Sequence, residues 1–451
     1  MYDLIIIGGG PAGYHGAEKA SLAGLNVAII EKTNLGGVCL NEGCIPSKTL
    51  LHSSKLFKQA KNSGPFGVLA ESVAFDLPTV IARKQKIVIG LRSAIAFTLK
   101  KSRVTIETGV AYVLPKDRDL FKVRINDKII EAPRLMICTG SEPVRPPVAG
   151  ADLPNVMTNK EILDVRAIPK NLVVVGGGVI GLEMACFFSE IGSMVTVVEM
   201  LPTIAANLDA EIRQHLKKEL EKNGVRFLLE TRVNEIKENA VLVESNGTAR
   251  AIEADLTLLS VGRRPLSQGL GLENIGVMVE HDAIVTDEHG KTSAAGVWAA
   301  GDVNGKSMLA HTAYREAEVC VADMVGAADS VDYDAVPAVV YTHPEAASVG
   351  LTEKEAVRRG LSVAVSRLPL SFNGRFIAET DAERGMCIAV LDKQSSRLIG
   401  LHMVGGNCSE MIYGAAAMIE NKQTVEDISK IVFPHPTVSE IIKETIMRAK
   451  F

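Results

Sequence analysis

Residues 4–13, with the sequence LIIIGGGPAG, place four apolar residues before three glycines and the segment Pro11-Ala12-Gly13. A short apolar run bounded by glycines is typical of a buried strand, and proline is typical of the first turn of a helix. The spacing G-x-G-x-x-G between such a strand and such a helix predicts a tight turn whose helix N-terminus receives a pyrophosphate. A second strand, residues 27–30, ends at Glu31, whose carboxylate can accept hydrogen bonds from ribose hydroxyls. The stretch therefore predicts a Rossmann unit with cofactor contacts at Gly8, Gly10, Gly13 and Glu31.

The same pattern returns near the middle of the chain. Residues 173–181, VVVGGGVIG, again join an apolar run to the glycine spacing, and the strand of residues 195–198 ends at Glu199. We therefore expect two dinucleotide folds in one chain; the alternative is a glycine-rich turn in a Rossmann unit that binds nothing. Because a carboxylate repels a 2′-phosphate, Glu199 favours NAD over NADP. The contacts expected in the second unit are Gly176, Gly178, Gly181 and Glu199.

Residues 36–48, GGVCLNEGCIPSK, hold Cys39 and Cys44 five positions apart. Pro46 is expected at the first position of a helix, which puts Cys44 at a helix N-terminus, where the macrodipole favours a thiolate. As a structural staple, so short a loop would contribute only about 2 kcal/mol. A metal site needs at least two further ligands, and no second cysteine pair or histidine cluster at metal spacing accompanies this one. We interpret the pair as redox-active, with inert thiols or a metal half-site as alternatives, and we predict no metal site.

The bulk composition fits a soluble α/β enzyme. The chain has 451 residues, of which 47% are hydrophobic and 23% charged. A length prior of about 150 residues per domain suggests roughly three domains. The net charge of −4 gives no sign of a nucleic-acid footprint. The N-terminus enters a strand directly, without room for a signal peptide, and no apolar run is long enough to span a bilayer, so we expect a cytoplasmic location.

Five further cysteines are scattered along the chain, which argues against a secreted disulfide framework. Four of them lie in apolar runs and are interpreted as small buried hydrophobes. These four are Cys138, Cys186, Cys320 and Cys387. Cys408 follows two glycines and an asparagine, and its role is left open.

Between the two glycine turns, residues 53–104 have the apolar periodicity of helices, and residues 104–130 are expected to form strands. The strand of residues 135–138 closes on Thr139-Gly140. Residues 141–143, together with Pro146 and Pro147, are interpreted as an exit loop and a plausible domain boundary.

After the second unit, a strand runs into Gly262-Arg263-Arg264-Pro265, where the arginines could be functional or simply solvated. A third glycine-acid turn, Gly301-Asp302, precedes the segment Met308-Leu309-Ala310-His311 and a helix that runs through Val319. Asp302 could be a helix cap or a turn residue.

The last hundred or so residues alternate strands and helices without a glycine fingerprint, so we assign them to an α+β interface domain. The expected strands lie around residues 336–341, 363–368, 386–391 and 399–404, and the expected helices around 352–359, 409–421 and 437–449.

His435 stands between two prolines near the C-terminus, and Glu440 follows five residues later. This pattern predicts a rigidly held imidazole whose second nitrogen is oriented by a carboxylate, the arrangement of a general base. Taken alone, such a histidine is more often a satisfied turn residue. It becomes a catalytic candidate because a thiol pair needs a proton acceptor.

Taken together, these motifs resemble the flavoprotein disulfide reductases of the class I pyridine nucleotide-disulfide oxidoreductase family. Within that family the chain is most similar to the dihydrolipoamide dehydrogenases, which serve as the E3 component of 2-oxoacid dehydrogenase complexes and the L-protein of glycine cleavage. The resemblance covers essentially the whole chain. It includes both glycine turns, the cysteine segment, Tyr341-Thr342-His343-Pro344-Glu345 and His435-Pro436-Thr437.

The resemblance implies that FAD is held in the first Rossmann unit and NAD in the second. It adds Asp302, Thr139, Gly140 and Ala310 to the FAD contacts and Gly262 to the NAD contacts. Lys48 and Glu183 resemble the ion pair beside the flavin. Cys44 would be the charge-transfer thiol and Cys39 the interchange thiol that meets the substrate.

The family further implies a homodimer in which His435 and Glu440 reach the cysteine pair of the other subunit. The lipoyl group would arrive on a separate protein, because Met1 begins directly in the first Rossmann strand. The expected fold is α/β with two Rossmann-like domains and a C-terminal α+β dimerisation domain. Its expected boundaries are 1–147 (FAD domain with the cysteine pair), 148–270 (NAD domain), 271–336 (central segment completing the FAD site) and 337–451 (interface domain).

Some residues depart from the family pattern. Val38 and Glu42 stand where Thr and Val are more usual, Thr312 replaces a common Lys, and Pro434 replaces Ala. Glu42 could shift the cysteine potential by repelling a thiolate. Two rival functions remain: a reductase of glutathione or another small disulfide, for which Glu199 is the wrong residue, and a flavin-binding assembly subunit without turnover.

Overall fold

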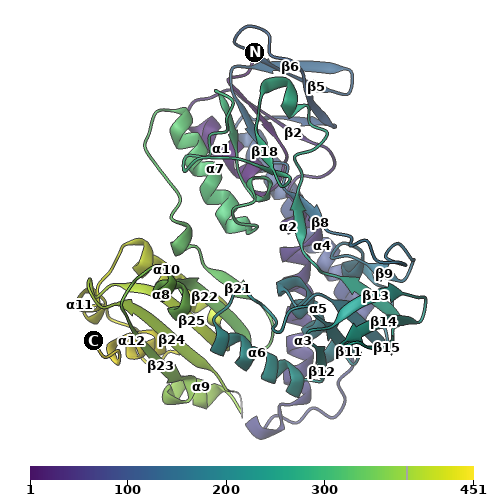
Figure 1. The fold of residues 1–451 in the computed structure, drawn as a ribbon, viewed down its shortest axis with the longest axis vertical. Coiled ribbons are helices and arrows are strands. Elements are labelled where there is room, and N and C mark those ends of the chain that lie inside the picture. The colour runs from purple at the N-terminus through teal and green to yellow at the C-terminus, as the bar shows by residue number, and fades with distance from the viewer. Residues whose placement is uncertain (382–383) are drawn as a thin grey trace. The chain divides into compact units, whose positions relative to one another are not determined.

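The computed structural model describes residues 1–381 and 384–451 and divides into two compact units (Figure 1). The first unit comprises Met1–Thr49, Pro78–Val144 and Gly262–Val331. The second comprises Leu50–Leu77, Arg145–Val261 and Asp332–Phe451. Within the described part of the chain, no helix has both the length and the apolarity needed to cross a membrane.

The first unit is built on a parallel five-stranded sheet with the strand order β20-β7-β1-β2-β3. Its strands are β1 (Leu4–Ile7), β2 (Val27–Glu31), β3 (Thr105–Thr108), β7 (Leu135–Ile137) and β20 (Val297–Ala299). All four residues of β1 are buried, as expected for a central strand that is covered on both faces. The helices α1 (Pro11–Leu22) and α7 (Ala310–Met324) pack against each other (Figure 1).

The cysteine segment forms two helices, α2 (Gly37–Glu42) and α3 (Cys44–Lys61). Pro46 is the third residue of α3, not the first as predicted. Its missing N–H is still harmless, because the amides of the first helical turn have no partner within the helix. The prediction that Cys44 starts a helix is confirmed.

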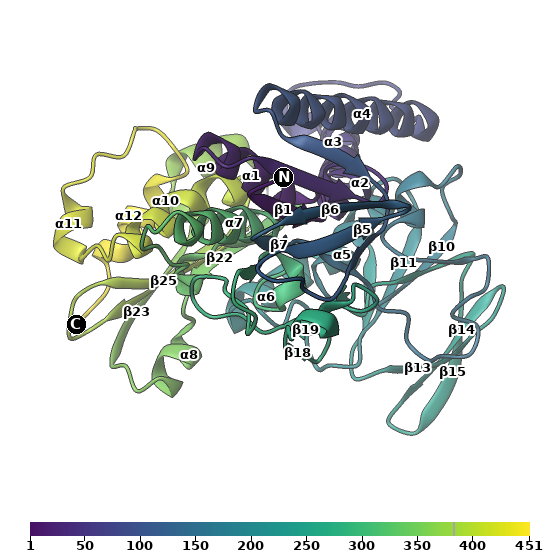
Figure 2. The ribbon, with the colours of Figure 1, turned by 90° about the horizontal axis from the view of Figure 1, so that it is seen from above.

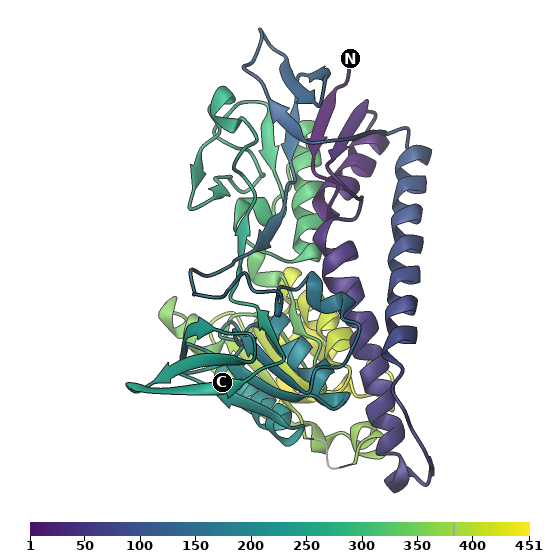
Figure 3. The ribbon, with the colours of Figure 1, turned by 90° about the vertical axis from the view of Figure 1, so that its right-hand side faces the viewer.

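The helical prediction for residues 53–104 is correct in type but not in continuity. After α3 the chain leaves the helix at residue 62, forms a short 3-10 turn at Gly64–Phe66, and enters α4 (Leu77–Lys101). Figure 3 shows α4 as one long uninterrupted helix. The break contains Gly64 and Pro65, two residues that disfavour a helix interior.

Three smaller sheets complete the first unit. Their strands are β4 (Ala111–Val113), β5 (Phe121–Ile125), β6 (Lys128–Ala132), β8 (Ser141–Pro143), β17 (Arg263–Pro265), β18 (Val279–Glu280) and β19 (Ala283–Ile284). The loop prediction is wrong for residues 141–143, because this segment is β8 and pairs antiparallel with β17, while the first unit's second segment ends directly after it at Val144. The partner lies more than a hundred residues away, so nothing in the local sequence indicates the pairing.

The second unit repeats the parallel five-stranded arrangement in the order β12-β11-β10-β16-β9. Its strands are β9 (Val156–Met157), β10 (Asn171–Val175), β11 (Met194–Val198), β12 (Val225–Leu228) and β16 (Leu256–Leu259), and its helices are α5 (Val179–Glu190) and α6 (Ala210–Lys222). The three-stranded antiparallel sheet of β13 (Arg232–Ile236), β14 (Ala240–Ser245) and β15 (Thr248–Glu253) follows, seen as extended strands in Figure 2.

The C-terminal part of the second unit is an antiparallel five-stranded sheet in the order β21-β22-β25-β24-β23. Its strands are β21 (Ala338–Val340), β22 (Glu345–Gly350), β23 (Val363–Pro369), β24 (Met386–Asp392) and β25 (Leu398–Gly405). The helices are α8 (Glu353–Arg358), α9 (Gly374–Glu379), α10 (Cys408–Glu420), α11 (Val425–Ser429) and α12 (Glu440–Met447). The predicted strands and helices are confirmed, whereas β22, α9 and α11 were not foreseen. The predicted α/β class with a separate α+β region is confirmed.

Candidate active site

The first glycine turn is closed by the acid that ends β2. The backbone N–H of Gly9 donates to Glu31 Oε2 at 2.7 Å, and the N–H of Thr33 donates to Glu31 Oε1 at 2.9 Å. No described side chain caps the N-terminus of α1, where Gly10 is the cap residue and Pro11 follows. The amides of that first turn are therefore available to a pyrophosphate, and the fixed carboxylate retains lone pairs for ribose hydroxyls. These residues fit FAD.

The second glycine turn repeats this geometry. The N–H of Gly177 donates to Glu199 Oε2 at 2.6 Å, and the N–H of Leu201 donates to Glu199 Oε1 at 2.8 Å. Gly178 is the cap residue of α5, again without a side-chain cap among the described residues. A Cβ on Gly178 would meet nothing within 4 Å, so the approach to the helix N-terminus is open. These residues fit NAD.

The third glycine of each motif is required by close packing within the turn. A Cβ on Gly13 would lie 1.8 Å from the carbonyl oxygen of Gly8, and one on Gly181 would lie 2.3 Å from that of Gly176. Any larger residue would push the helix away from the strand.

Cys39 and Cys44 form a disulfide. Cys39 lies in α2, Cys44 is the first residue of α3, and their Cα atoms are 4.6 Å apart, within the range that a disulfide spans without backbone movement. Both residues are partly exposed. The first turn of α3 would stabilise a thiolate at Cys44 after reduction, because the positive end of the helix dipole lies at this residue.

Asp302 belongs to a hydrogen-bond network in the first unit. Ser141 Oγ donates to Asp302 Oδ2, and Arg263 donates to Ser141 through Nε to Oγ and through a terminal nitrogen to the carbonyl, both at 2.8 Å. Burial lowers the pKa of the Arg263 guanidinium, while the nearby charges of Asp302, Glu42 and Glu142 oppose that shift. Sequence reasoning left Arg263 open and missed Ser141 altogether. No local sequence pattern indicates Ser141, because its position beside Arg263 depends on the pairing of β8 with the distant strand β17.

The charge of Glu42 therefore acts on Arg263. Arg264, by contrast, is exposed and pairs with Glu142 on the surface. Of the two arginines, only Arg263 contributes to the interior of the network.

The remaining predicted FAD contacts lie in the first unit. Thr139 Oγ1 donates to the carbonyl oxygen of Leu266 at 2.6 Å, and Gly140 has a φ of +73° with open space around its missing Cβ. Asp302 begins a 3-10 turn, and Ala310 is the first residue of α7. Gly262, predicted to contact NAD, lies at the start of the first unit's third segment with a φ of +128°.

Lys48 and Glu183 lie in different units. Lys48 is part of the first turns of α3, and Glu183 is buried in α5 with its carboxylate accepting from the N–H of Tyr341 at 3.2 Å. Their pairing stays a prediction.

The predicted orientation of His435 by Glu440 is present in the structure. His435 Nδ1 lies 2.9 Å from Glu440 Oε1, and the N–H of Thr437 donates to Glu440 Oε2 at 2.9 Å. These two contacts, the Thr437 amide first, lower the pKa of the Glu440 carboxyl, so Glu440 is ionised when His435 donates to it. The His435 side chain is 81% exposed, which leaves Nε2 free to meet another molecule.

The five free cysteines are all buried, as predicted for four of them, and Cys408 is buried as well. Burial raises the pKa of the Cys387 thiol to about 12 and raises those of Cys138, Cys186 and Cys320 too. None of these thiols is therefore a ready nucleophile on its own.

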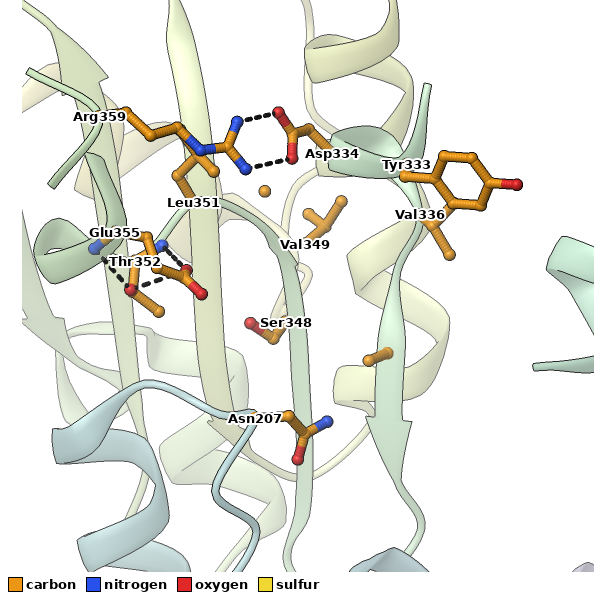
Figure 4. A pocket seen from close by; sticks show the side chains of 12 residues that line it. Asn207, Tyr333, Asp334, Val336, Ser348, Val349, Leu351, Thr352, Glu355 and Arg359 are labelled. Atoms are coloured by element: carbon orange, nitrogen blue, oxygen red, sulfur yellow. Dashed lines mark hydrogen bonds and ion pairs between the residues drawn. The ribbon is translucent and has the colours of Figure 1, made fainter. Parts of the chain in front are cut away.

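A cavity of about 170 Å³ lies in the second unit beside β21, β22 and α8 (Figure 4). Four of its polar residues form two pairs: Asp334 and Arg359 form a two-pronged pair at 2.5 and 2.9 Å, and Thr352 and Glu355 form a helix capping box. None of the predicted site residues lines it.

Two uncapped Rossmann turns, together with a disulfide at a helix N-terminus, define a dinucleotide-dependent disulfide oxidoreductase. Residues 2–317 match the family model "Pyridine nucleotide-disulphide oxidoreductase", and residues 336–446 match the dimerisation domain of the same family. The chain belongs to the pyridine nucleotide-disulphide oxidoreductase family. The two predicted cofactors, FAD and NAD, are confirmed at the level of this family.

Within this family, the chain is similar to several individual proteins. The chain is 39% identical to a mitochondrial dihydrolipoyl dehydrogenase of Pisum sativum, over 99% of this chain and 91% of the relative. It is 37% identical to a dihydrolipoyl dehydrogenase of Rhizobium etli, over 99% and 98%. The crystal structure of LpdA from Mycobacterium tuberculosis matches with a TM-score of 0.92 at 27% identity and covers 99% of both chains.

Proposed function

We propose that this chain is a dihydrolipoamide dehydrogenase, which oxidises protein-bound dihydrolipoyl groups to the lipoyl disulfide and reduces NAD⁺ to NADH. The observation that carries the proposal is the Cys39–Cys44 disulfide at the start of α3. It occurs in a chain with two dinucleotide turns and 37–39% identity to dihydrolipoyl dehydrogenases over its whole length.

The thiol chemistry is a disulfide exchange. A dihydrolipoyl thiol loses its proton to His435 Nε2, and the resulting thiolate attacks the sulfur of Cys39. The Cys39–Cys44 bond breaks, and Cys44 leaves as a thiolate stabilised by the N-terminus of α3. The second lipoyl thiol then attacks the lipoyl sulfur of the mixed disulfide, which releases the cyclic lipoyl disulfide, and Cys39 leaves as a thiolate that takes up the proton of that second thiol.

The two Rossmann turns and the residues near them would hold the cofactors. When bound, FAD and NAD supply two-electron transfer from the reduced thiol pair to a nicotinamide. FAD would be held by Gly8, Gly10, Gly13, Glu31, Thr139, Gly140, Asp302 and Ala310, and NAD by Gly176, Gly178, Gly181, Glu199 and Gly262. Lys48 and Glu183 would act as a charged pair beside the flavin.

We propose a homodimer in which His435 of one copy serves the cysteine pair of the other. The 81% exposure of the His435 side chain in the single chain supports this, and so does the match to a dimerisation domain. The proposed domains are 1–147 for FAD, 148–270 for NAD, 271–336 to complete the FAD site and 337–451 for the interface. We further propose a cytoplasmic enzyme whose lipoyl group is presented by a separate E2-type or glycine-cleavage carrier protein.

One comparative assay tests the function. The purified protein is expected to be yellow and to reduce NAD⁺ with dihydrolipoamide, while NADPH oxidation by glutathione disulfide stays at background. Activity only in the second reaction would show the rival function, a small-disulfide reductase. Cys44→Ser is expected to lose dihydrolipoamide oxidation while retaining bound flavin, and full activity in that variant would exclude the proposed exchange.

A second experiment tests the role of His435 as the general base. Glu440→Gln is expected to lower kcat and to alter the pH profile of kcat/KM, because His435 loses the negatively charged partner that orients its ring. An unchanged profile would contradict the role of the pair. Glu426→Gln is the matched control, because Glu426 is an exposed carboxylate near the same end of the chain that forms an ion pair with Lys430 instead of a histidine.

A further inference from the structure

A second group of chemically active side chains lies in the second unit, outside the residues assigned above. Cys186 and Glu190 are one helical turn apart on α5, and His343 comes from the segment between β21 and β22. Cys186 Sγ lies 3.8 Å from His343 Nδ1, which in turn lies 3.0 Å from both carboxylate oxygens of Glu190. One donor atom from each of these three residues fits within 4.8 Å of the others.

The three residues are held in place by further contacts. The backbone N–H of His343 donates to Cys186 Sγ at 3.3 Å, and the His343 carbonyl accepts from the Asn223 side chain at 3.0 Å. Ser54 Oγ donates to Glu190 Oε2 at 2.7 Å. The imidazole is thus fixed through its backbone on both sides, and the carboxylate is fixed from a second helix, α3.

Burial makes this arrangement unusual. The Glu190 side chain is 1% exposed and the Cys186 residue 1% exposed, so a carboxylate and a thiol sit away from water. The His343 side chain is 14% exposed, and the Lys58 side chain, whose Nζ lies 3.3 Å from Glu190 Oε1, is 30% exposed, so the cluster is reached from the Lys58 and His343 side. A buried carboxylate needs a cation, and the partly exposed Lys58 supplies that charge in the metal-free protein.

We propose that Cys186, Glu190 and His343 form a binding site for Zn²⁺. Tetrahedral zinc with ordinary bond lengths sets its sulfur and nitrogen ligands about 3.5 Å apart and its nitrogen and oxygen ligands about 3.3 Å apart. The 3.8 and 3.0 Å separations lie close to those edges. A mixed thiolate, imidazole and carboxylate set favours zinc over magnesium or calcium, which prefer oxygen alone. Ser54 Oγ or a water molecule takes the fourth position.

Binding of Zn²⁺ releases one proton from the site. Zinc replaces the thiol proton of Cys186, which leaves to solvent. The neutral His343 ring moves its proton from Nδ1 to Nε2, so Nδ1 becomes a ligand and no net proton is lost there. Glu190 is already ionised and exchanges its hydrogen bond from His343 for the metal. Lys58 then faces a cation instead of a lone carboxylate, so it opposes binding.

Zinc titration of the oxidised, chelator-treated holoenzyme tests the site. Without reductant the Cys39–Cys44 pair is a disulfide and cannot supply thiolates. Calorimetry and metal content after gel filtration are expected to give one tightly bound Zn²⁺ per chain. Cys186→Ser is expected to weaken binding by at least about 100-fold, since it removes a metal ligand. Cys320→Ser, which removes another fully buried thiol, is the matched control and is expected to bind as the wild type does.

A second test uses Lys58→Met, which is expected to strengthen zinc binding where Cys186→Ser weakens it. Removing the ammonium frees Glu190 and is expected to tighten zinc binding by about 5-fold, the scale of a partly exposed ion pair. Glu190→Gln is expected to weaken binding and replaces Cys186→Ser if the latter fails to retain flavin. The proposal is overturned if the wild type binds no stoichiometric Zn²⁺, if Cys320→Ser loses it equally, or if Lys58→Met weakens it. All readouts are independent of turnover and of the proposed function.

Discussion

The glycine turn at Gly8 and the one at Gly176 share the same local geometry but differ in what covers them. Both leading glycines have a φ of +108°, and in both turns the acid at the end of the next strand accepts an amide of the turn. The first turn is covered by the cysteine segment: Gly36 N–H donates to Gly9 O at 2.7 Å. A Cβ on Gly37 would lie 2.6 Å from the Cα of Gly10.

The second turn is also covered at its middle glycine, where Ala205 N–H donates to Gly177 O at 2.9 Å, but its cap residue is open. Gly178 is exposed, whereas Gly10 is half-buried, and a Cβ on Gly178 would meet nothing within 4 Å. Sequence identity within the motif therefore does not decide how tightly a cofactor is enclosed. We propose that the covered turn retains its cofactor and that the open turn exchanges its cofactor in each cycle.

Alanine at the leading glycine should separate the two turns most strongly. The Cβ of Gly8→Ala would lie 2.2 Å from the carbonyl oxygen of Cys138, and that of Gly176→Ala would lie 2.4 Å from that of Ser260. Backbone strain alone costs about 1–3 kcal/mol at such a position, before the collision is counted. We expect Gly8→Ala to purify without flavin and Gly176→Ala to remain yellow but fail to reduce NAD⁺. Flavin absorbance per chain measures the difference, and equal flavin loss in both variants would contradict it.

Cofactor addition to flavin-free protein should show the next largest difference. A ligand present at a thousandfold excess over its Kd stabilises the folded state by about 4 kcal/mol, whereas one present near its Kd adds about 0.4 kcal/mol. At equal micromolar concentration, FAD is expected to raise the thermal unfolding midpoint clearly and NAD hardly at all. Scanning fluorimetry provides the measurement. A larger shift with NAD would reverse the assignment of the covered and open turns.

The two acids should differ in nucleotide selection. Glu199→Gln keeps an acceptor oxygen for Gly177 N–H or Leu201 N–H but removes the charge that repels a 2′-phosphate. We expect the ratio of kcat/KM for NAD over NADP to fall about tenfold, which corresponds to about 1.4 kcal/mol. Glu31→Gln is the matched control and should leave this ratio unchanged while lowering flavin content. If Glu199→Gln keeps the wild-type ratio, Glu199 does not select the nucleotide.

Alanine at the cap glycine should have the smallest effect on folding. The Cβ of Gly178→Ala meets open space, and that of Gly10→Ala lies 3.6 Å from Gly37 Cα, an ordinary contact. Each is expected to change the free energy of unfolding by less than about 0.5 kcal/mol. Gly178→Ala should nevertheless raise the KM for NAD⁺, because the methyl group occupies the path of the pyrophosphate. A stability loss as large as that of Gly176→Ala would show that the cap position is not open.

Local sequence was sufficient for the elements that depend on nearby residues. The glycine spacing, the flanking apolar runs and the acid at the end of the second strand predicted both Rossmann turns, because each is built within about thirty residues. The cysteine segment predicted a helix starting at Cys44, and His435 with Glu440 predicted an oriented imidazole, because both depend on residues at most five positions apart.

Long-range pairing was decided only by the tertiary structure. Ser141 looked like part of a loop, yet it lies in β8 and joins Asp302 to Arg263 across more than a hundred residues. Cys186, Glu190 and His343 converge for the same reason, since no local periodicity relates α5 to the segment before β22. The cover over Gly10 and its absence over Gly178 likewise follow from which distant backbone packs on each turn. Local spacing determines what a turn can bind, whereas packing between distant segments determines how it is enclosed.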